Sequence, residues 1–415
     1  MNPLDTMDPG LFFRPLSIAT AEIEAAVRNA LSAACGTHLR AVVLIGSLAR
    51  GEGSLLETSE GLRLLGDAEF LVVFRRRSLV LPASRLNDIG RSVESALRDA
   101  GIFCHIDLGG VAPQFFATLP RRIFTLDLRH NGRVVLGDPS LLDAIPCFGP
   151  EAIDKEDAWR LLSNRLIEWL EKLAEVPDGQ NGPGIELYYA SAKLLLAVAA
   201  SWLVFLGTYE PTYVGSAERF RTLAAESRGL PNLPFSMSDL ASRVSQAVRW
   251  KICPDHAAST RSAWSFCLAA RDSARRLWSW ELAQMTGQDP TLDPLQLVQH
   301  SSPHLGTARR YRAWLRTARD FGWRRSLPCW PRWCRLARRA TPRYWVYALA
   351  AECASRGSAL DSGQALAVDA EMVALDLERF LPVAWKAGSL RQHDWQAFIG
   401  GLAWNYHHLL ERTWE

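Results

Sequence analysis

The stretch "LIGSLARGEGS", residues 44–54, marks the point where an apolar run gives way to a glycine-rich turn. The run itself, "AVVLI" at 41–45, is typical of a short buried strand. Gly46 and Gly51 have the four-residue gap of a phosphate-binding P-loop, but Glu52 stands where that loop has a lysine. The turn is therefore not a P-loop, and the residues around it must explain its glutamate and arginine.

The flanking patterns predict a region of mixed α and β structure. Apolar residues recur at helical spacing over 17–35, and a polar helical stretch covers 84–100. "AEFLVVF" at 68–74 and "IFCHIDLGG" at 102–110 are typical of strands. Two apolar runs within 122–138, separated by His-Asn-Gly, predict a hairpin.

From residue 154 onward the apolar pattern is helical almost throughout. We therefore predict an α+β protein, in which an N-terminal mixed sheet with flanking helices is followed by a long all-α region. A stretch with Pro and Gly around 286–305 is expected to separate two helical parts. The predicted domains are 1–147, 150–285 and 305–415.

Composition indicates a folded protein but names no partner. The chain is 48% hydrophobic and 22% charged, with a net charge of +3. Its eight cysteines include no Cys-x-x-Cys pair, which gives no indication of a zinc site. The N-terminus lacks the pattern of a signal peptide, and the longest apolar stretch, 194–207, is shorter than a membrane span. We expect a buried core helix there and a cytoplasmic protein.

Carboxylates follow the turn in a pattern that suits metal binding. Asp67 and Glu69 are two residues apart at the start of a predicted strand, so both side chains share one face. Asp107 on the next predicted strand would be a third carboxylate if the two strands are neighbours. Carboxylate oxygens suit Mg²⁺, and three convergent carboxylates can hold two ions that brace a phosphoryl displacement.

Such ions would remove the need for a P-loop lysine. Gly46 and Ser47 would then offer backbone N–H groups and a hydroxyl to the phosphates, at the start of a helix whose dipole favours anions. Arg50 is close enough in sequence to add further donors to the same phosphates.

The order Gly46-Ser47, Asp67-Ala68-Glu69 and Asp107 resembles the Gly-Ser … Asp-x-[Asp/Glu] … Asp pattern of the DNA polymerase β-like nucleotidyltransferase superfamily. "GSLARGEGS" is most similar to its small-substrate branch, which includes the aminoglycoside and minimal nucleotidyltransferases. The resemblance covers about residues 15–145. The sequence departs from it at "LLETSEGLRLL", 55–65, an apparent insertion that lengthens the gap between Ser47 and Asp67.

The resemblance implies a role for each of these residues. Asp67 and Glu69 would bind both metal ions, while Asp107 would bind one and accept the proton of the acceptor hydroxyl. Ser47 would hold the β and γ phosphates. Family members often place a lysine of the helical domain on the triphosphate, and Lys193 is the candidate here.

Each assignment has a plainer alternative. Asp67 and Glu69 would otherwise be a turn aspartate and an edge-strand glutamate in solvent. Asp127, on the presumed hairpin, rivals Asp107 as the third carboxylate. His105 shares a face with Asp107 and is expected to be a bystander, and Lys193 could be an ordinary lysine at a helix start.

Residues 308–345 are the other conspicuous stretch, with twelve arginines, several tryptophans and one acidic residue, Asp320. Arginine with aromatic residues suits nucleic acid or an anionic membrane surface. Pro328 and Pro331 should break a long amphipathic helix, which weakens the membrane interpretation. We expect a mainly structural segment whose tryptophans pack in the core and which binds nucleic acid only weakly.

The function predicted from the sequence is Mg²⁺-dependent transfer of NMP from an NTP, with ATP favoured, to a hydroxyl of a small acceptor such as a sugar, releasing pyrophosphate. A protein side chain or an RNA 3′ end is also possible as the acceptor. The alternative is a non-catalytic protein that binds nucleic acid or an anionic membrane through 308–345.

Overall fold

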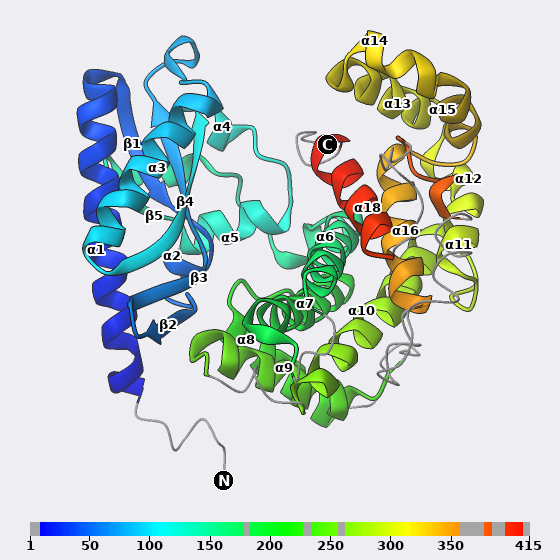
Figure 1. Cartoon of the computed structure of the whole chain (residues 1–415), viewed down its shortest axis with the longest axis horizontal. Coiled ribbons are helices and arrows are strands. Elements are labelled where there is room, and N and C mark those ends of the chain that lie inside the picture. The colour runs from blue at the N-terminus through cyan, green and yellow to red at the C-terminus, as the bar shows by residue number, and fades with distance from the viewer. Residues whose placement is uncertain are drawn as a thin grey trace. The chain divides into compact units, whose positions relative to one another are not determined.

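The computed structural model describes residues 9–177, 182–226, 235–255, 262–356, 377–383 and 395–409 (Figure 1). The chain divides into a sheet unit and a helical unit: residues 1–157, 206–222 and 244–255 against 158–205, 223–243 and 256–415. The protein is therefore α+β, with an N-terminal mixed sheet and a helical C-terminal region. The sheet unit extends past the predicted boundary at 147 and takes in two segments of the predicted 150–285 domain. The helical unit is not divided around 286–305.

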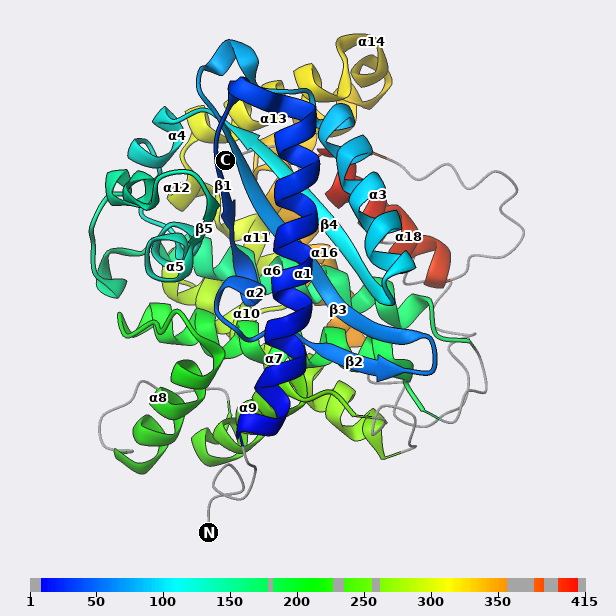
Figure 2. The ribbon, with the colours of Figure 1, turned by 90° about the vertical axis from the view of Figure 1, so that its left-hand side faces the viewer.

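Five strands form one mostly antiparallel sheet (Figure 2). The longest strand, β3, pairs antiparallel with β1 and β2 and parallel with β4, while β5 pairs antiparallel with β1. The strands predicted at 41–45, 68–74 and 102–110 are confirmed, and the apparent insertion at 55–65 forms β2 together with the start of β3. The strands are β1 (Leu39–Leu44), β2 (Leu55–Thr58), β3 (Gly61–Phe74), β4 (Ile102–Val111) and β5 (Arg133–Leu136).

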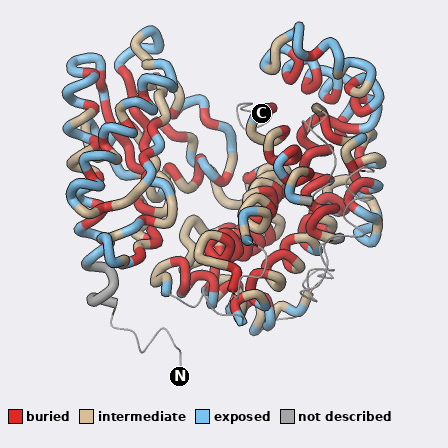
Figure 3. Tube along the Cα trace, viewed as in Figure 1, coloured by how far each residue is buried: buried red, intermediate tan, exposed pale blue. Residues whose placement is uncertain are grey.

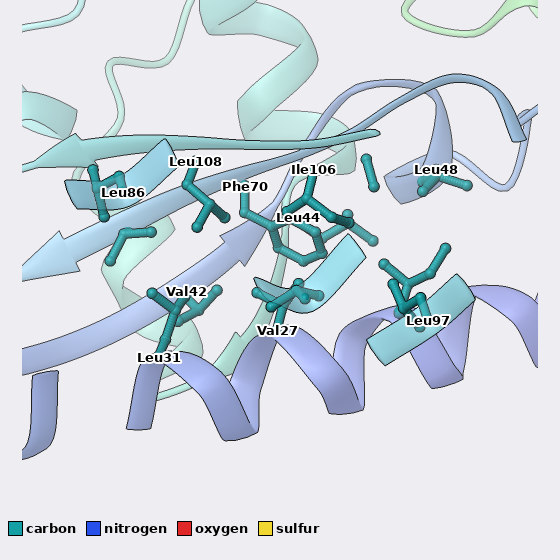
Figure 4. Close-up of a cluster of buried hydrophobic side chains, with 14 of the residues drawn as sticks. Val27, Leu31, Val42, Leu44, Leu48, Phe70, Leu86, Leu97, Ile106 and Leu108 are labelled. Carbon is teal, nitrogen blue, oxygen red and sulfur yellow. The ribbon is translucent and has the colours of Figure 1, made fainter. Parts of the chain in front are cut away.

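Helices α1 and α3 cover one face of the sheet, and both were predicted. Ile23, Val27 and Leu31 of α1 recur at spacings of four residues and are all buried. They belong to the same core as Phe70 of β3 and Ile106 of β4, where Figure 4 shows Val27 and Leu31 beside the strands. The helices of the sheet unit are α1 (Pro9–Cys35), α2 (Gly46–Ala49), α3 (Ala83–Asp99), α4 (Gln114–Ala117), α5 (Ile123–Asn131) and α8 (Tyr213–Glu226, shared with the helical unit), with short 3₁₀ turns at Gly36–His38, Arg77–Leu79, Pro139–Ala144 and Pro150–Ala152.

The opposite face of the sheet carries a second, smaller core. Val43 of β1 and Leu71 of β3 pack there with Phe116 of α4 and Leu128 of α5. Leu71 lies two residues beyond Glu69 and therefore on the same face of β3. Asp67 and Glu69 thus stand on this second face, before the point in β3 where α4 and α5 cover it.

The predicted hairpin at 122–138 is wrong. Residues 123–131 form the helix α5, and only 133–136 form a strand, β5. Ile123, Leu126 and Thr125 are buried, and the Gly132 N–H donates to the Leu128 carbonyl at 2.9 Å. Gly132 therefore ends a helix instead of turning a hairpin. The hairpin was predicted because, over only nine residues, the helical spacing of the buried positions resembles the alternation of a strand.

Long helices with many buried residues build the helical unit (Figure 3). Aromatic rings fill part of its core. Trp159 lies at its centre, with ring centroids 5.3 Å from Trp278, 4.7 Å from Tyr344 and 5.3 Å from Tyr347. Burying such rings supplies much of the driving force for folding this unit. Its helices are α6 (Lys155–Ala174), α7 (Gly184–Phe205), α9 (Met237–Ile252, shared with the sheet unit), α10 (Ala263–Thr286), α11 (Pro294–His300), α12 (Ser302–Leu305), α13 (Thr307–Phe321), α14 (Trp323–Ser326), α15 (Trp330–Ala337), α16 (Pro342–Arg356) and α18 (Trp395–Leu409), with a 3₁₀ turn at Leu327–Cys329.

Most of the apolar stretch at 194–207 lies in α7, which ends at Phe205, as predicted for a core helix. Among the described residues, α7 alone has the length and composition to cross a membrane, and 89% of its most apolar stretch is buried inside the protein. The prediction that the tryptophans of 308–345 pack in the core is correct for Trp314, Trp333 and Trp345. It is wrong for Trp323 and Trp330, which are 56% and 40% exposed.

Candidate functional site

Three acidic side chains stand together on neighbouring strands. In the parallel pairing of β3 with β4, Glu69 is the register partner of Asp107, and Asp67 is the partner of His105. Register partners lie on the same face, and neighbouring strands are about 4.8 Å apart. Asp67 and Asp107 are exposed and Glu69 is half-buried, while Ala68 between the β3 acids is buried on the other face. We call Asp67, Glu69 and Asp107 the carboxylate face.

The Gly-Ser turn lies directly against this face. The Ile45 N–H, just before the turn, donates to the Glu69 carbonyl at 3.0 Å. Gly46 has a φ of +69°, and a Cβ placed on it would lie 2.5 Å from Oε2 of Glu69. A side chain at Gly46 would therefore be strained and would also collide with the carboxylate. Ser47 follows in α2, which is a single turn of four residues, so the predicted contribution of a helix dipole is small.

The donor chemistry of the face suits a hard cation, since the three side chains offer only carboxylate oxygens. As the side chains stand, no three His, Cys, Asp or Glu groups within the described ranges are close enough together to hold a metal ion. The strand register fixes the positions of the three backbones, whereas the carboxylate ends turn about the side-chain bonds. The arrangement can thus present oxygens from two adjacent strands to a ligand beside the Gly46-Ser47 turn.

The His105 side chain contacts helix α3. Its ring Nδ1 is 2.7 Å from Oε1 of Glu94 on α3, and the same oxygen accepts from the Ile106 N–H at 2.9 Å. Glu94 thereby holds both the imidazole and the edge strand β4.

The glutamate of the glycine-rich turn caps a helix. Glu52 is 5% exposed, and its carboxylate accepts from the Tyr213 N–H at 3.0 Å and the Val214 N–H at 3.1 Å. These are the first N–H groups of α8, which have no partner within the helix. A carboxylate at this position also complements the positive end of the helix. Glu52 therefore ties the turn to a segment that begins 161 residues further along the chain.

Arg50 occupies the space between two carboxylates rather than an exposed position. Its Nε donates to Glu52 at 3.1 Å and its Nη1 donates to Asp127 of α5 at 3.3 Å. The Tyr209 hydroxyl donates to the other oxygen of Asp127 at 2.8 Å, and the Tyr213 ring lies 4.7 Å from the Arg50 guanidinium. The Arg50 side chain is only 8% exposed. The phosphate role predicted for Arg50 would require this arginine to leave a buried network.

A buried lysine completes the network. Lys251 is 1% exposed, and its ammonium donates to the Ser54 hydroxyl at 2.8 Å. The Ser54 hydroxyl in turn donates to the Lys251 carbonyl at 2.5 Å. Lys251 thus fastens the end of the glycine-rich turn to the last turn of α9. We call the whole group the loop cluster: Arg50, Glu52, Ser54, Asp127, Tyr209, Tyr213 and Lys251.

Titration in the loop cluster is shifted by burial. Burial raises the pKa of Asp127 to about 7, against the opposing effects of Arg50 and the Tyr209 hydrogen bond, while Glu52 adds to the rise. Burial and the neighbouring Asp127 raise the pKa of Tyr209 well above its usual range. For Arg50, burial acts to lower the pKa, but Tyr213, Asp127 and Glu52 outweigh it and raise the pKa. One arginine serves two acids here, and Asp127 retains its proton more easily than an ordinary aspartate.

Lys193, predicted to reach the triphosphate, forms an ion pair within the helical unit. Its ammonium contacts Glu168 of α6, which also pairs with Arg165. Although burial acts to raise the pKa of Glu168, the two cations outweigh it and lower that pKa to about 2. Lys193 is therefore engaged with an ionised carboxylate on its own unit.

Sequence reasoning found the carboxylate face but missed the loop cluster. Glu52 was conspicuous because it replaced a lysine, yet its partners lie near residue 213. Lys251 stands out in the sequence only because lysine is rare, with five lysines among 47 basic residues. No local pattern connects Glu52 to Lys251, because the two meet only through tertiary structure.

Comparison with known proteins adds no relative: no family model, no curated protein and no solved structure matches the chain.

Proposed function

We propose that the protein is a Mg²⁺-dependent nucleotidyltransferase. It would transfer NMP from an NTP, with ATP favoured, to a hydroxyl of a small acceptor such as a sugar, and release pyrophosphate. The observation that carries the proposal is the carboxylate face beside the Gly46-Ser47 turn, with Glu69 and Asp107 in register on adjacent strands. The resemblance of these residues to the DNA polymerase β-like superfamily gives the pattern its chemical meaning.

The residues present fit the metal that this reaction needs. Their donors are all carboxylate oxygens, the ligands that Mg²⁺ prefers. Gly46 leaves room beside Glu69 that a Cβ would fill, at 2.5 Å from Oε2. Asp67 and Glu69 would hold both ions and Asp107 would hold one. When bound, the two ions would stabilise the charge that develops on the attacking and leaving oxygens.

The chain's own groups would orient the reactants and move one proton. Ser47 would donate its hydroxyl to the outer phosphates, beside the backbone of the turn. Asp107 would accept the proton of the acceptor hydroxyl as that oxygen attacks the α-phosphorus, and the bond to the pyrophosphate oxygen breaks. Asp107 suits this role because it is exposed and stands on the edge strand β4. Holding both reactants here would remove much of the entropic barrier of a two-substrate reaction.

The position of the label in ATP tests this proposal. The full-length protein is incubated with Mg²⁺ and a deproteinised cell extract as the source of acceptors, using α-labelled or γ-labelled ATP. We expect an acceptor that takes label from α-labelled ATP only, with the γ label recovered in pyrophosphate. Asp67→Asn should abolish the transfer, and Asp99→Asn, an exposed aspartate at the end of α3, should not. Transfer of the γ label would indicate a kinase instead, and no transfer of either label would refute the proposal.

A further inference from the structure

Helices α13 to α15 present a dense array of arginines to solvent. Most of the twelve arginines of 308–345 are exposed, and Asp320 is the sole acidic residue in the stretch. The Asp320 carboxylate accepts from Arg319 at 2.8 Å. This surface therefore has a strong positive charge in a protein whose overall charge is only +3. The exposed arginines are Arg309, Arg312, Arg316, Arg319, Arg324, Arg325, Arg335, Arg338 and Arg339.

The same helices also expose large apolar side chains. Of the eight large hydrophobic residues that are exposed in the described ranges, five lie between 311 and 330. They are Tyr311, Leu315, Trp323, Leu327 and Trp330, with Leu327 the most exposed at 69%. Single exposed apolar residues are ordinary, but a concentration of this kind marks an interaction surface.

The apolar residues of 323–337 form one outward stripe. Pro328 and Pro331 were expected to break a helix here, yet Leu327, Cys329 and Trp330 keep right-handed helical backbone angles. Each proline instead stands in the first turn of the next helical piece, where its missing N–H costs little. The run is therefore nearly continuous.

Exposed apolar residues recur along this run at helical spacing. Trp323, Leu327 and Trp330 recur at i, i+4 and i+7 and all are exposed. Ser326 and Trp333 are buried beside this stripe, with the Trp333 ring centroid 6.5 Å from that of Trp330, and the Trp333 indole N–H donates to the Pro382 carbonyl at 2.6 Å. The buried face fixes the run to the helical unit, and the apolar stripe is left on the outside.

Helix α13 repeats the arrangement. Tyr311 and Leu315 are one turn apart and 41% and 46% exposed. Arg312, Arg316 and Arg319 follow the same side of the helix at spacings of four and three residues. The buried side of α13 carries Trp314, Ala318 and others of the core. Both helices thus combine an outward apolar strip with arginines beside it.

We propose that α13 and the run 323–337 bind the surface of an anionic lipid bilayer. Trp323, Leu327 and Trp330 would enter the boundary between headgroups and acyl chains, while the exposed arginines contact lipid phosphates. This proposal does not depend on the transferase reaction proposed for the sheet unit. It also revises the sequence-based expectation of a mainly structural segment.

The charge and the leucines together favour a membrane over other partners. A second copy of this surface would bring the same arginines face to face, which is unfavourable. Single-stranded nucleic acid would use the arginines and stack on the aromatic rings, but leucine has no π-face for stacking. The two exposed leucines, including the most exposed apolar residue, have a role only in an apolar environment.

Co-sedimentation with vesicles tests the proposal on the full-length protein. We expect binding to vesicles of phosphatidylcholine mixed with phosphatidylglycerol, weakening with salt, and no binding to phosphatidylcholine alone. Leu327→Ser or Trp323→Ser should weaken binding about tenfold each through lost apolar burial. Arg324→Gln with Arg325→Gln should weaken it roughly thirtyfold. All four side chains are exposed, so these variants should fold.

A matched double variant provides the control. Arg76→Gln with Arg77→Gln removes the same charge from exposed positions of the sheet unit and should leave vesicle binding unchanged. The proposal fails if no vesicle is bound, if both lipid compositions bind equally, or if Leu327→Ser has no effect. Tight, leucine-independent binding of a single-stranded oligonucleotide would assign the surface to nucleic acid instead. Self-association lost in Leu327→Ser would assign it to a second copy.

Discussion

The carboxylate face and the loop cluster lie within one unit but use their charges in opposite ways. On the face, like charges stand together on adjacent strands, and Asp67 and Asp107 are exposed. In the cluster, opposite charges meet in the interior, with Arg50 8% and Glu52 7% exposed as side chains. Buried pairs hold the fold together, whereas grouped like charges oppose it unless a cation is bound. The face thus exposes two of its carboxylates, whereas the charged groups of the cluster hold the fold together.

The largest expected effect is on catalysis at the face. Asp67→Asn should lower NMP transfer by on the order of 10³-fold or more, because it removes a metal ligand without removing packing. Its melting temperature without ligand should equal or slightly exceed that of the wild type, since one like charge is gone. Steady-state kinetics and calorimetry measure the two effects. If Asp67→Asn kept near-normal transfer, the carboxylate face would have no catalytic role to distinguish it from the loop cluster.

Next in size is the loss of stability in the cluster. Glu52→Ala leaves Arg50 with a single carboxylate and removes the cap from α8, so we expect a loss of about 3 kcal/mol or more in unfolding free energy. Urea denaturation followed by circular dichroism measures it. Glu57→Gln, an exposed glutamate on β2, is the matched control and should change stability by less than about 0.5 kcal/mol. Equal losses in both variants would contradict the assigned role of Glu52.

A smaller effect should appear in the pH dependence of stability. Because the pKa of Asp127 is raised to about 7 in the folded protein, the native state binds its proton more tightly than the unfolded chain. The resulting stabilisation is complete at low pH, below the unfolded pKa, and is lost as pH rises through about 7.

Asp127→Asn should therefore remove a decline in stability, on the order of 2 kcal/mol, between about pH 5 and pH 7. Urea unfolding at several pH values compares this variant with Asp99→Asn, which should keep the wild-type profile. An unchanged profile in Asp127→Asn would show that Asp127 is ionised throughout this range.

The two regions also differ in how far the sequence predicts them. The elements that carry the face follow local patterns: the apolar run before Gly46, the β3 alternation around Asp67, and the buried spacing of α1. The sequence left open whether the two strands with acids are neighbours, and the structure pairs them with Glu69 opposite Asp107. These features depend on residues close together in sequence, or on one strand pairing.

The cluster depends on contacts that no local pattern carries. The Glu52 carboxylate meets N–H groups of Tyr213 and Val214, and Lys251 meets Ser54 across 197 residues. Asp127 was placed on a hairpin because nine residues are too few to separate a helical spacing from alternation. The outward stripe around Leu327 was missed because burial of an apolar residue is decided by what packs on it, not by its own type.

Whether the carboxylate face binds a nucleotide through Mg²⁺ can be measured by titration calorimetry. ATP is titrated with and without Mg²⁺ into the wild type, Asp67→Asn and Asp127→Asn. If the carboxylate face and the Gly46-Ser47 turn form one metal and nucleotide site, the wild type binds ATP tightly only with Mg²⁺. Asp127→Asn then keeps this Mg²⁺-dependent binding, and Asp67→Asn loses it. Equal affinity for ATP with and without Mg²⁺, or tight binding retained in Asp67→Asn, would show that the carboxylate face is not a metal and nucleotide site.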